Sequence, residues 1–202
     1  IVGHCGRIGT KILTVFAFSS ENWNRPQKEV NRLMDLFMRA LDKEAKELDE
    51  NGVRLSFIGD IDGFSQNLRE SIRRASRQTE HNQRMTLNVA VNYGGRWDIV
   101  QAARSLARKA AKGLIDPNDI DEEMMSRHIS LNAKDPDLFI RTGGEMRVSN
   151  FLLWQSAYTE FYFSPTLWPD FGPDELDKAI AVYQSRERRF GLTSEQIREK
   201  SA

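Results

Sequence analysis

The sequence has 202 residues, of which 40% are hydrophobic, and its 29 basic side chains balance its 29 acidic ones. A chain of this size can bury one sizeable core, so we expect a single domain over residues 1–202. Balanced charge gives no global field that would attract nucleic acid, so any affinity for an anion must be local.

The cysteine content and the hydropathy pattern exclude two further classes of protein. One cysteine, Cys5, cannot form an intrachain disulfide and fits a reducing cytoplasm. No apolar run approaches the roughly 20 residues of a membrane span. The segment 3–7 breaks any apolar region of the kind that a signal peptide needs. We therefore expect a soluble cytoplasmic protein.

The first half of the chain predicts a buried strand followed by a long helix. Residues 1–11 show no clear period; they are either a flexible segment or two fragments joined where a stretch of the protein is missing. Residues 12–18 are almost all apolar, which is typical of a strand buried on both faces of a parallel sheet. A polar cluster, 19–25, follows, and Pro26 suits the first turn of a helix that ends at Asn51-Gly52.

Apolar residues of this helix follow helical spacing but make an unusually wide stripe. Either the helix is buried against two neighbours, or it also lines an apolar cavity. The stripe comprises Val30, Leu33, Met34, Leu36, Phe37, Met38, Leu41 and Leu48.

Strand and helix patterns alternate along the rest of the chain. We expect strands at 53–59, 85–91, 138–140 and 161–163, and helices at 64–80, 99–112, 116–128, 149–159 and from 173 onward. We expect the helix at 99–112 to face the core with Ile99, Val100, Ala103, Leu106 and Ala107. Such alternation implies parallel strands with right-handed crossovers, whose ligands bind beyond the carboxyl ends of the strands. Three polar clusters, 19–25, 92–98 and 141–149, should therefore share one rim.

The last of these clusters has the composition of an anion site. A short strand delivers Arg141 into Gly143-Gly144, and Arg147 and Ser149 follow. Ser149 is a good helix N-cap, and unpaired N–H groups at a helix start attract anions. Two guanidiniums beside such an end favour a phosphate or diphosphate site. The alternative is an ordinary tight turn with two solvated arginines.

Several catalytic motifs are absent from the sequence. There is no Ser-His-Asp order, no paired-cysteine metal pattern, no P-loop and no dinucleotide-binding glycine pattern. Arginines with one or two carboxylates instead suit a diphosphate substrate that carries magnesium. Glu160 is a candidate metal ligand, although its position alone favours a solvated or salt-bridged side chain. A structural role is expected for His128.

Five strings in order along the chain resemble the cis-prenyltransferase family, and within it the bacterial undecaprenyl diphosphate synthases. They are FSSENWNRP (18–26), NYGGRWDIV (92–100), IRTGGE (140–145), RVSNFLLWQ (147–155) and LWPDF (167–171). The resemblance implies an α/β fold whose central, mostly parallel sheet is flanked by helices and encloses an apolar product tunnel. It also implies a homodimer that condenses isopentenyl diphosphate repeatedly onto farnesyl diphosphate. The product would be undecaprenyl diphosphate, the lipid carrier precursor for bacterial cell-wall synthesis.

The resemblance assigns roles to individual residues. Asn22 corresponds to the residue credited with proton removal, but an amide is a poor base and would rather position a diphosphate oxygen or a water. Arg25 would grip the allylic diphosphate. Further residues implied in substrate binding are His4, Ser19, Ser20, Glu21, Trp23, Arg141, Arg147, Val148, Ser149 and, reaching into the partner subunit's site, Arg189 and Gly191. Glu160 would ligate Mg²⁺, and Leu33, Leu36 and Phe37 would line the tunnel.

The sequence departs from the family pattern in two places. Met146 stands where many bacterial members have histidine. The family also opens with a strand and an Asp-Gly-Asn loop that carries the magnesium aspartate, and no such string is present. Ile1-Val2 could be a remnant of that strand, and Gly3-His4 the family's Gly-His pair on the following helix. We expect the full protein to contain the aspartate loop.

Two other functions remain open at this stage. A non-catalytic accessory subunit of a cis-prenyltransferase complex could lack the aspartate, although it would not need every diphosphate contact. A phosphatase would need a nucleophile or a metal cluster at the rim, and the sequence shows neither there. We further expect transient contact with a membrane surface, where a long polyprenyl product would be released.

Overall fold

The computed structural model describes residues 1–131, 133–187 and 196, which form two compact units. We call residues 2–132 the N-terminal unit, and residue 1 with residues 133–202 the C-terminal unit. The expectation of one domain over the whole chain stays a prediction.

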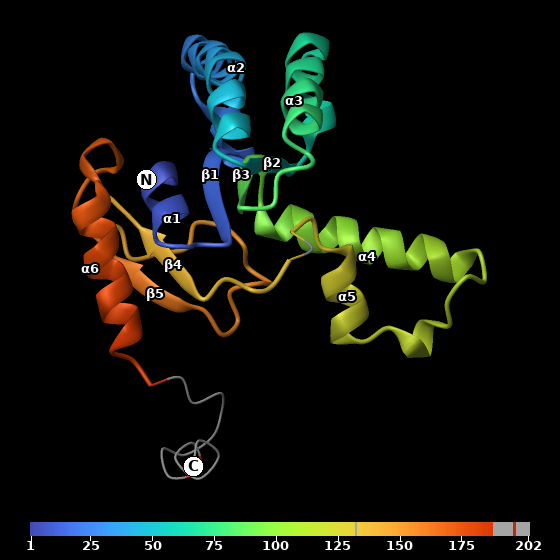
Figure 1. Cartoon of the computed structure of the whole chain (residues 1–202). Coiled ribbons are helices and arrows are strands. Elements are labelled where there is room, and N and C mark those ends of the chain that lie inside the picture. The colour runs from blue at the N-terminus through green and yellow to red at the C-terminus, as the bar shows by residue number, and fades with distance from the viewer. Residues whose placement is uncertain (132, 188–195, 197–202) are drawn as a thin grey trace. The chain divides into compact units, whose positions relative to one another are not determined.

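A three-stranded parallel sheet organises the N-terminal unit (Figure 1). Strands β1 (Ile12–Ser19), β2 (Val53–Ile58) and β3 (Met85–Tyr93) lie in the order β1-β3-β2. The central strand β3 is almost completely buried, whereas β1 buries only Phe18. The prediction that this first strand is buried on both faces is therefore wrong, because Ile12 and Ala17 are exposed and only Phe18 is buried.

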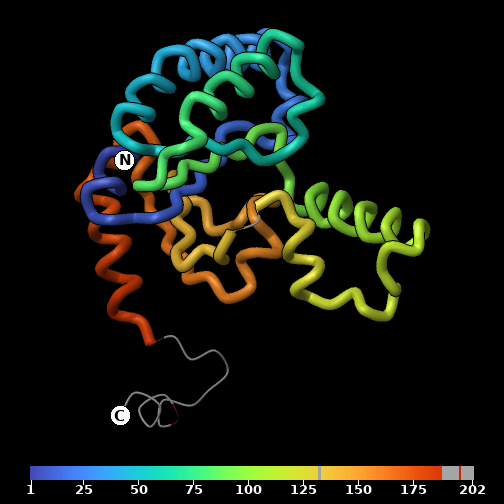
Figure 2. Tube along the Cα trace, turned by 45° about the vertical axis from the view of Figure 1, so that its right-hand side comes forward, coloured from blue at the N-terminus to red at the C-terminus, as the bar shows by residue number. Residues whose placement is uncertain are grey.

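Two helices lie side by side against this sheet (Figures 1 and 2). Helix α2 (Gln27–Glu50) begins directly after Pro26, as predicted, and buries Val30, Leu41 and Ala45. Helix α3 (Gln66–Gln78) buries Leu68, Ile72 and Ala75. Its N-cap, Ser65, accepts a hydrogen bond from the Leu68 N–H at 3.4 Å, so one of the unpaired donors of the first turn is satisfied.

A second helical pair completes the N-terminal unit. Helix α4 (Gly95–Ala111) contacts α5 (Glu122–His128), which follows the short 3-10 turn η3 (Pro117–Asp119). Helix α4 begins four residues earlier than predicted and buries Asp98, Ala102 and Leu106. Val100, Ala103 and Ala107 are exposed, so the expected core face was wrong for these three residues.

The orientation of α4 follows from a buried polar group. Asp98 accepts hydrogen bonds from the Tyr93 hydroxyl at 2.9 Å and from the Ser130 N–H at 2.8 Å and hydroxyl at 2.6 Å. A buried carboxylate needs such donors, and together they turn this face of the helix inward. A pattern of apolar residues alone does not reveal this.

A short helix also forms at residues 2–7, where the local pattern predicted no element and only the family resemblance placed Gly3-His4 on a helix. Helix α1 (Val2–Arg7) buries Cys5, and Arg84 Nη2 donates to the Gly6 carbonyl at 3.2 Å. The contact with Arg84, 78 residues away, explains why local sequence did not predict it.

The C-terminal unit contains a second, two-stranded parallel sheet. Strands β4 (Leu138–Arg141) and β5 (Glu160–Phe163) pair, and helix α6 (Pro173–Gln184) packs on them. The 3-10 turn η4 (Trp168–Asp170) precedes α6. With both sheets parallel and flanked by helices, the predicted α/β class is confirmed, whereas the apolar tunnel stays a prediction.

The helix expected at 149–159 does not form. Ser149, Asn150 and Leu152 have φ values of 47°, 61° and 45°, in the left-handed region that interrupts a right-handed helix. Turns replace the helix, and Leu152 is buried. Over the described residues, no helix is both long and apolar enough to cross a membrane.

Candidate functional site

Two polar loops meet at the carboxyl end of the three-stranded sheet. The pairing of β1 with β3 ends with Ser19 opposite Tyr93, after a register irregularity around Ala17. The chain then enters the 3-10 turn η1 (Ser20–Asn24), which we call, with Ser19 and Arg25, the 19–25 loop. The predicted proximity of the 19–25 and 92–98 clusters is confirmed by a hydrogen bond between Trp23 and Asn92. The place of the 141–149 cluster at the same rim stays a prediction.

Asn22 uses its carbonyl oxygen to hold the 19–25 loop. Its Oδ1 accepts a hydrogen bond from the Ser19 backbone N–H at 2.9 Å. This contact fixes the orientation of the amide and leaves its NH₂ group, among the described contacts, available as a donor. A donor can bind a diphosphate oxygen but cannot accept a proton.

The other polar side chains of the loop make short-range contacts. Arg25 pairs with Glu29 on α2 at 2.5 Å, and both side chains are about half exposed. The Ser20 hydroxyl donates to Glu21 at 3.1 Å. The Arg25 guanidinium is thus anchored through one nitrogen, and the rest of its planar fork faces solvent.

Trp23 is held by two aromatic contacts and by a hydrogen bond at its nitrogen. Its ring contacts Phe18 edge-on, with centroids 5.2 Å apart, and Phe64 at 6.0 Å. Its Nε1 donates to Asn92 Oδ1 at 2.7 Å. Although 40% of Trp23 is exposed, the indole therefore has one defined position.

His4 lies on α1. Its Nδ1 is 3.4 Å from Arg7 Nη2 on the same helix. This contact neither supports nor contradicts the predicted role in substrate binding.

In the C-terminal unit, β4 leads into the predicted glycine turn. Gly143 and Gly144 have φ values of 85° and 76°, which residues with a Cβ rarely adopt. Their N–H groups donate to the carbonyls of Thr166 and Ser164, both at 2.9 Å. The N–H groups of both glycines are therefore engaged within the protein, so the turn is not an open cradle of N–H groups.

Arg141 and Ser149 come together as predicted. Arg141 Nη1 donates to the Ser149 hydroxyl at 2.8 Å. Arg141 Nε is buried and has no hydrogen-bond partner among the described residues. A buried guanidinium nitrogen without an acceptor costs free energy, and no described residue offsets that cost at this atom.

Among the described contacts, Arg147 touches neither Arg141 nor Ser149. It forms an ion pair with Glu145 and its side chain is 64% exposed. Val148, its neighbour, is half-buried, and its carbonyl accepts from the Phe151 N–H at 3.1 Å. The geometry thus supports Arg141 with Ser149 more strongly than Arg147 or Val148.

Glu160 lies at the far end of the two-stranded sheet from Arg141. It begins β5 opposite Leu138, whereas Arg141 ends β4 opposite Phe163, about 10 Å along the strands. Its Oε2 pairs with Arg186 Nη1 at 2.6 Å. Among the described residues no three metal-ligating side chains cluster, so the protein side chains alone do not assemble a metal site there.

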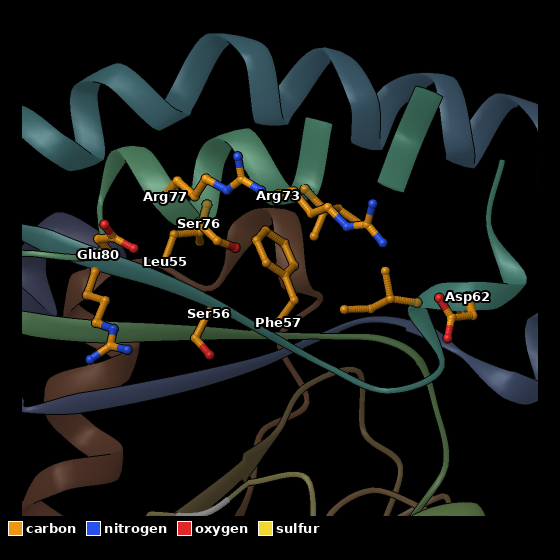
Figure 3. Close-up of a pocket in the computed structure, with 11 residues that line it drawn as sticks. Leu55, Ser56, Phe57, Asp62, Arg73, Ser76, Arg77 and Glu80 are labelled. Atoms are coloured by element: carbon orange, nitrogen blue, oxygen red, sulfur yellow. The ribbon is translucent and has the colours of Figure 1, made fainter. Parts of the chain in front are cut away.

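The predicted tunnel residues all lie on α2, but they differ in environment. Leu33 and Phe37 are half-buried, whereas Leu36 is 61% exposed. The Phe37 ring contacts Phe57 at 6.3 Å. Phe57 in turn lines a cavity of about 500 Å³ that runs along β2 and under α3 (Figure 3).

This cavity combines an apolar floor with charged walls. Arg73 and Arg77 project from α3 above the strand, and Glu80 lies in the turn that follows this helix (Figure 3). Its lining comprises Arg54, Leu55, Ser56, Phe57, Ile61, Asp62, Ile72, Arg73, Ser76, Arg77 and Glu80. None of the three predicted tunnel residues belongs to it, so their lining role stays a prediction.

Two predicted residues and one missed residue complete the comparison with the sequence. Arg189 and Gly191 lie outside the described residues.

Asn92 was recognised only as part of a polar cluster, yet it contacts two other loops. The signal available in the sequence was an asparagine directly after a buried strand, where a left-handed residue is common.

Comparison with known proteins identifies the family. Residues 1–191 match the prenyltransferase family model described as "Putative undecaprenyl diphosphate synthase". The ditrans,polycis-undecaprenyl-diphosphate synthase of Haemophilus influenzae, named as specific for (2E,6E)-farnesyl diphosphate, is 52% identical over 193 residues. The alignment covers 95% of this chain and 81% of that protein. The Escherichia coli enzyme of the same name is 53% identical over 186 residues, or 92% and 74% of the two chains.

Solved structures agree with this assignment. A lavandulyl diphosphate synthase from Lavandula x intermedia, in complex with dimethylallyl diphosphate, superposes with a TM-score of 0.91 at 42% identity, covering 95% of this chain and 83% of that one. A probable undecaprenyl diphosphate synthase from Campylobacter jejuni gives 0.85 at 37% identity, covering 94% and 88%. The chain therefore belongs to the undecaprenyl diphosphate synthase family of prenyltransferases.

Proposed function

We propose that the protein elongates a prenyl chain, condensing isopentenyl diphosphate repeatedly onto farnesyl diphosphate to give undecaprenyl diphosphate. The observation that carries this proposal is the family match over residues 1–191, with relatives above 50% identity that are named farnesyl-diphosphate-specific synthases. Because these relatives are named as synthases, they favour an enzyme over the accessory subunit.

Two described clusters supply the anion-binding groups that this reaction needs. We assign the diphosphate of isopentenyl diphosphate to Arg141 and Ser149, since Arg141 Nε is buried without an acceptor. We assign the allylic diphosphate to Arg25 in the 19–25 loop. Arg147, now paired with Glu145, would join the first of these sites by exchanging its carboxylate partner for the substrate.

The chemistry determines what these groups must do. The allylic C–O bond breaks and diphosphate leaves with the electron pair, a C–C bond forms to the isopentenyl double bond, and a proton is lost. Fixed guanidiniums stabilise the charge that develops on the leaving diphosphate. Because the Asn22 carbonyl is engaged by Ser19, its NH₂ group would orient a diphosphate oxygen while another acceptor takes the proton.

We further propose that the reaction depends on Mg²⁺. Magnesium prefers oxygen ligands and keeps near-octahedral geometry, and a diphosphate can supply much of that shell. When bound, the ion would neutralise the leaving diphosphate. Glu160 is the described carboxylate that we assign to it, and this role requires Glu160 to part from Arg186.

The assembly and location of the protein are also proposals. We infer a cytoplasmic homodimer in which Arg189 and Gly191 complete the partner subunit's site. The long apolar product would bring the enzyme into transient contact with a membrane surface.

The test is turnover of radiolabelled isopentenyl diphosphate with farnesyl diphosphate and Mg²⁺, with products sized by chromatography. We expect a polyprenyl product near eleven isoprene units, and at least a hundredfold slower turnover by Arg141→Ala. Arg104→Ala is the matched control, because Arg104 is an exposed arginine on α4. The assay uses the full-length protein with its aspartate loop. If that protein is folded by circular dichroism but inactive, or if it performs a single condensation without elongation, the proposal is contradicted.

A further inference from the structure

We propose that Asn92 is a positioning residue for the reaction: its amide fixes Trp23 and, through Trp23, the 19–25 loop that carries Asn22 and Arg25. The catalytic part of this inference rests on the proposed function. Its geometric part rests only on the contacts of the N-terminal unit.

The Asn92 side chain connects three segments that are distant in sequence. Its Oδ1 accepts from Trp23 Nε1 at 2.7 Å, and its Nδ2 donates to the Asp60 carbonyl at 2.8 Å. Its own carbonyl accepts from the Asp60 N–H at 3.2 Å. One amide thus joins the end of β3, the 19–25 loop and the loop that follows β2.

The backbone conformation restricts which residue can do this. Asn92 has φ of 46°, a left-handed conformation that glycine, asparagine and aspartate tolerate best. Of these three, only asparagine offers a donor and an acceptor on one neutral side chain. Asn92 is also 8% exposed, so water does not readily replace either partner.

The surroundings hold the amide in one orientation. A Cβ on Gly63 would lie 2.8 Å from Asn92 Nδ2, so this glycine leaves only the space that the amide fills. On the other side, the Trp23 ring is packed against Phe18 and Phe64. Trp23 can therefore shift only if the amide, the aromatic contacts or the loop shift with it.

The consequence for the reaction follows from the position of Trp23 in the sequence. It lies between Asn22 and Arg25, the two residues of the loop that we assign to a diphosphate. A misplacement of about 1 Å at reacting groups is enough to slow an enzyme strongly. Asn92 touches none of the groups assigned to the diphosphates, so its effect on turnover would pass through the loop.

The geometric part is tested without substrate, by the indole N–H signals in a ¹H–¹⁵N spectrum. The protein has four tryptophans, and Trp23→Phe identifies the signal of Trp23. We expect Asn92→Gly, which keeps the backbone conformation, to shift that signal and accelerate its exchange with solvent. Asn92→Asp keeps an acceptor for the indole and should preserve its slow exchange. An unchanged Trp23 signal in Asn92→Gly overturns the proposal.

The catalytic part is tested by steady-state kinetics on folded variants. We expect Asn92→Gly and Trp23→Phe each to lower kcat/KM for farnesyl diphosphate about fivefold or more, as for loss of one hydrogen bond, while KM for isopentenyl diphosphate changes less than twofold. The double variant should be no slower than the worse single variant, because both remove one contact. Full additivity, or a lower Tm with unchanged kinetics, overturns the proposal.

Gly63→Ala gives an independent check that leaves both partners in place. The added methyl group displaces the amide, so we expect the same shift of the Trp23 signal and the same loss in kcat/KM. If Asn92→Gly does not fold, Trp23→Phe and Gly63→Ala still decide the matter. If the wild-type protein has no prenyltransferase activity, the proposed function fails, whereas the spectra still test the geometry.

Discussion

At the residue scale, Arg141 illustrates how the fold leaves a charged group partly satisfied. Its Nη1 is anchored by the Ser149 hydroxyl, while its Nε is buried with no acceptor among the described residues. Arg147 has the opposite environment, since it is paired with Glu145 and largely exposed. Two arginines that look equivalent in the sequence are thus expected to contribute unequally.

We therefore predict that Arg141→Lys raises KM for isopentenyl diphosphate tenfold or more. A lysine keeps the charge but presents a point ammonium in place of a planar fork, and it cannot hold Ser149 and a diphosphate in the same geometry. Arg147→Lys is the matched control and should change KM less than threefold. Initial rates at saturating farnesyl diphosphate measure both constants. Equal effects at the two positions would contradict the inequality.

At the element scale, a hydrogen bond from the end of α3 satisfies a backbone donor on the edge strand β2. The Leu55 N–H on β2 donates to the Thr79 hydroxyl at 2.9 Å, and that hydroxyl donates to the Ala75 carbonyl at 3.0 Å. The hydroxyl at the end of α3 therefore satisfies a donor that a sheet edge would otherwise leave unpaired.

Replacing this hydroxyl should destabilise the protein and expose the edge. Thr79→Val keeps the shape but leaves the buried Leu55 N–H without an acceptor, which costs about 1–3 kcal/mol. Thr79→Ser keeps the hydroxyl and should lose less than half as much. Urea unfolding gives the two free energies, and light scattering near the midpoint reports aggregation. A valine variant as stable as the wild type would show that the edge is not protected in this way.

Helix α6 holds the glycine turn through Glu175. This carboxylate accepts from Lys178 at 2.5 Å and from the Thr166 hydroxyl at 3.3 Å, and Thr166 O accepts the Gly143 N–H. The hydrogen bond from Lys178, then its charge and the bond from Thr166, lower the pKa of Glu175. A lowered pKa means that the carboxylate stabilises the fold above its unfolded pKa of about 4.3, and that this contribution is lost as pH falls through the lower folded value.

The pH dependence of a variant checks this contribution. We expect Glu175→Gln to be less stable than the wild type at pH 7, with the difference shrinking toward zero as the pH falls below about 4. Thermal unfolding of both proteins between pH 3 and pH 8 measures it. Asp174→Asn, which neutralises the preceding residue, is the matched control. A difference between the two proteins that grows on acidification would contradict the sign of the pKa shift.

The helices and strands show which parts of the fold the sequence could predict and which it could not. Short apolar runs predicted the strands β1 to β5, and apolar residues at helical spacing predicted the helices α2, α3 and α6. The helix at 149–159 was wrong because left-handed residues at 149, 150 and 152 override a good helical composition. Helix α1 and the buried face of α4 depend on Arg84 and Asp98, whose partners are far away in sequence. In the candidate site, the sequence correctly predicted that Arg141 and Ser149 lie together. The contacts of Asn92 could not be predicted, because they join three segments that are distant in sequence.

At the scale of the whole molecule, the balanced charge limits how the protein can meet a membrane. The formal net charge is zero and the pI is about 7.0, so no global attraction to anionic lipid is expected. No helix among the described residues can span a bilayer. We therefore expect contact with a membrane to depend on the apolar product rather than on lipid charge.

Vesicle co-sedimentation during turnover tests this expectation. The bound fraction should rise as long-chain product accumulates and should differ less than twofold between neutral vesicles and vesicles with 30% anionic lipid, a composition chosen on the order of that of natural anionic leaflets. If binding without substrates increases steeply with anionic lipid, this expectation is contradicted and a local basic surface is indicated.

The cavity of Figure 3 is a candidate for such a basic surface, since Arg54, Arg73 and Arg77 line it and have no ion pair among the described residues. If the charge-dependent binding is found, the double variant Arg73→Ala/Arg77→Ala should abolish it. Arg104→Ala on α4 should not, because electrostatic attraction to a surface falls off within a Debye length of the basic groups.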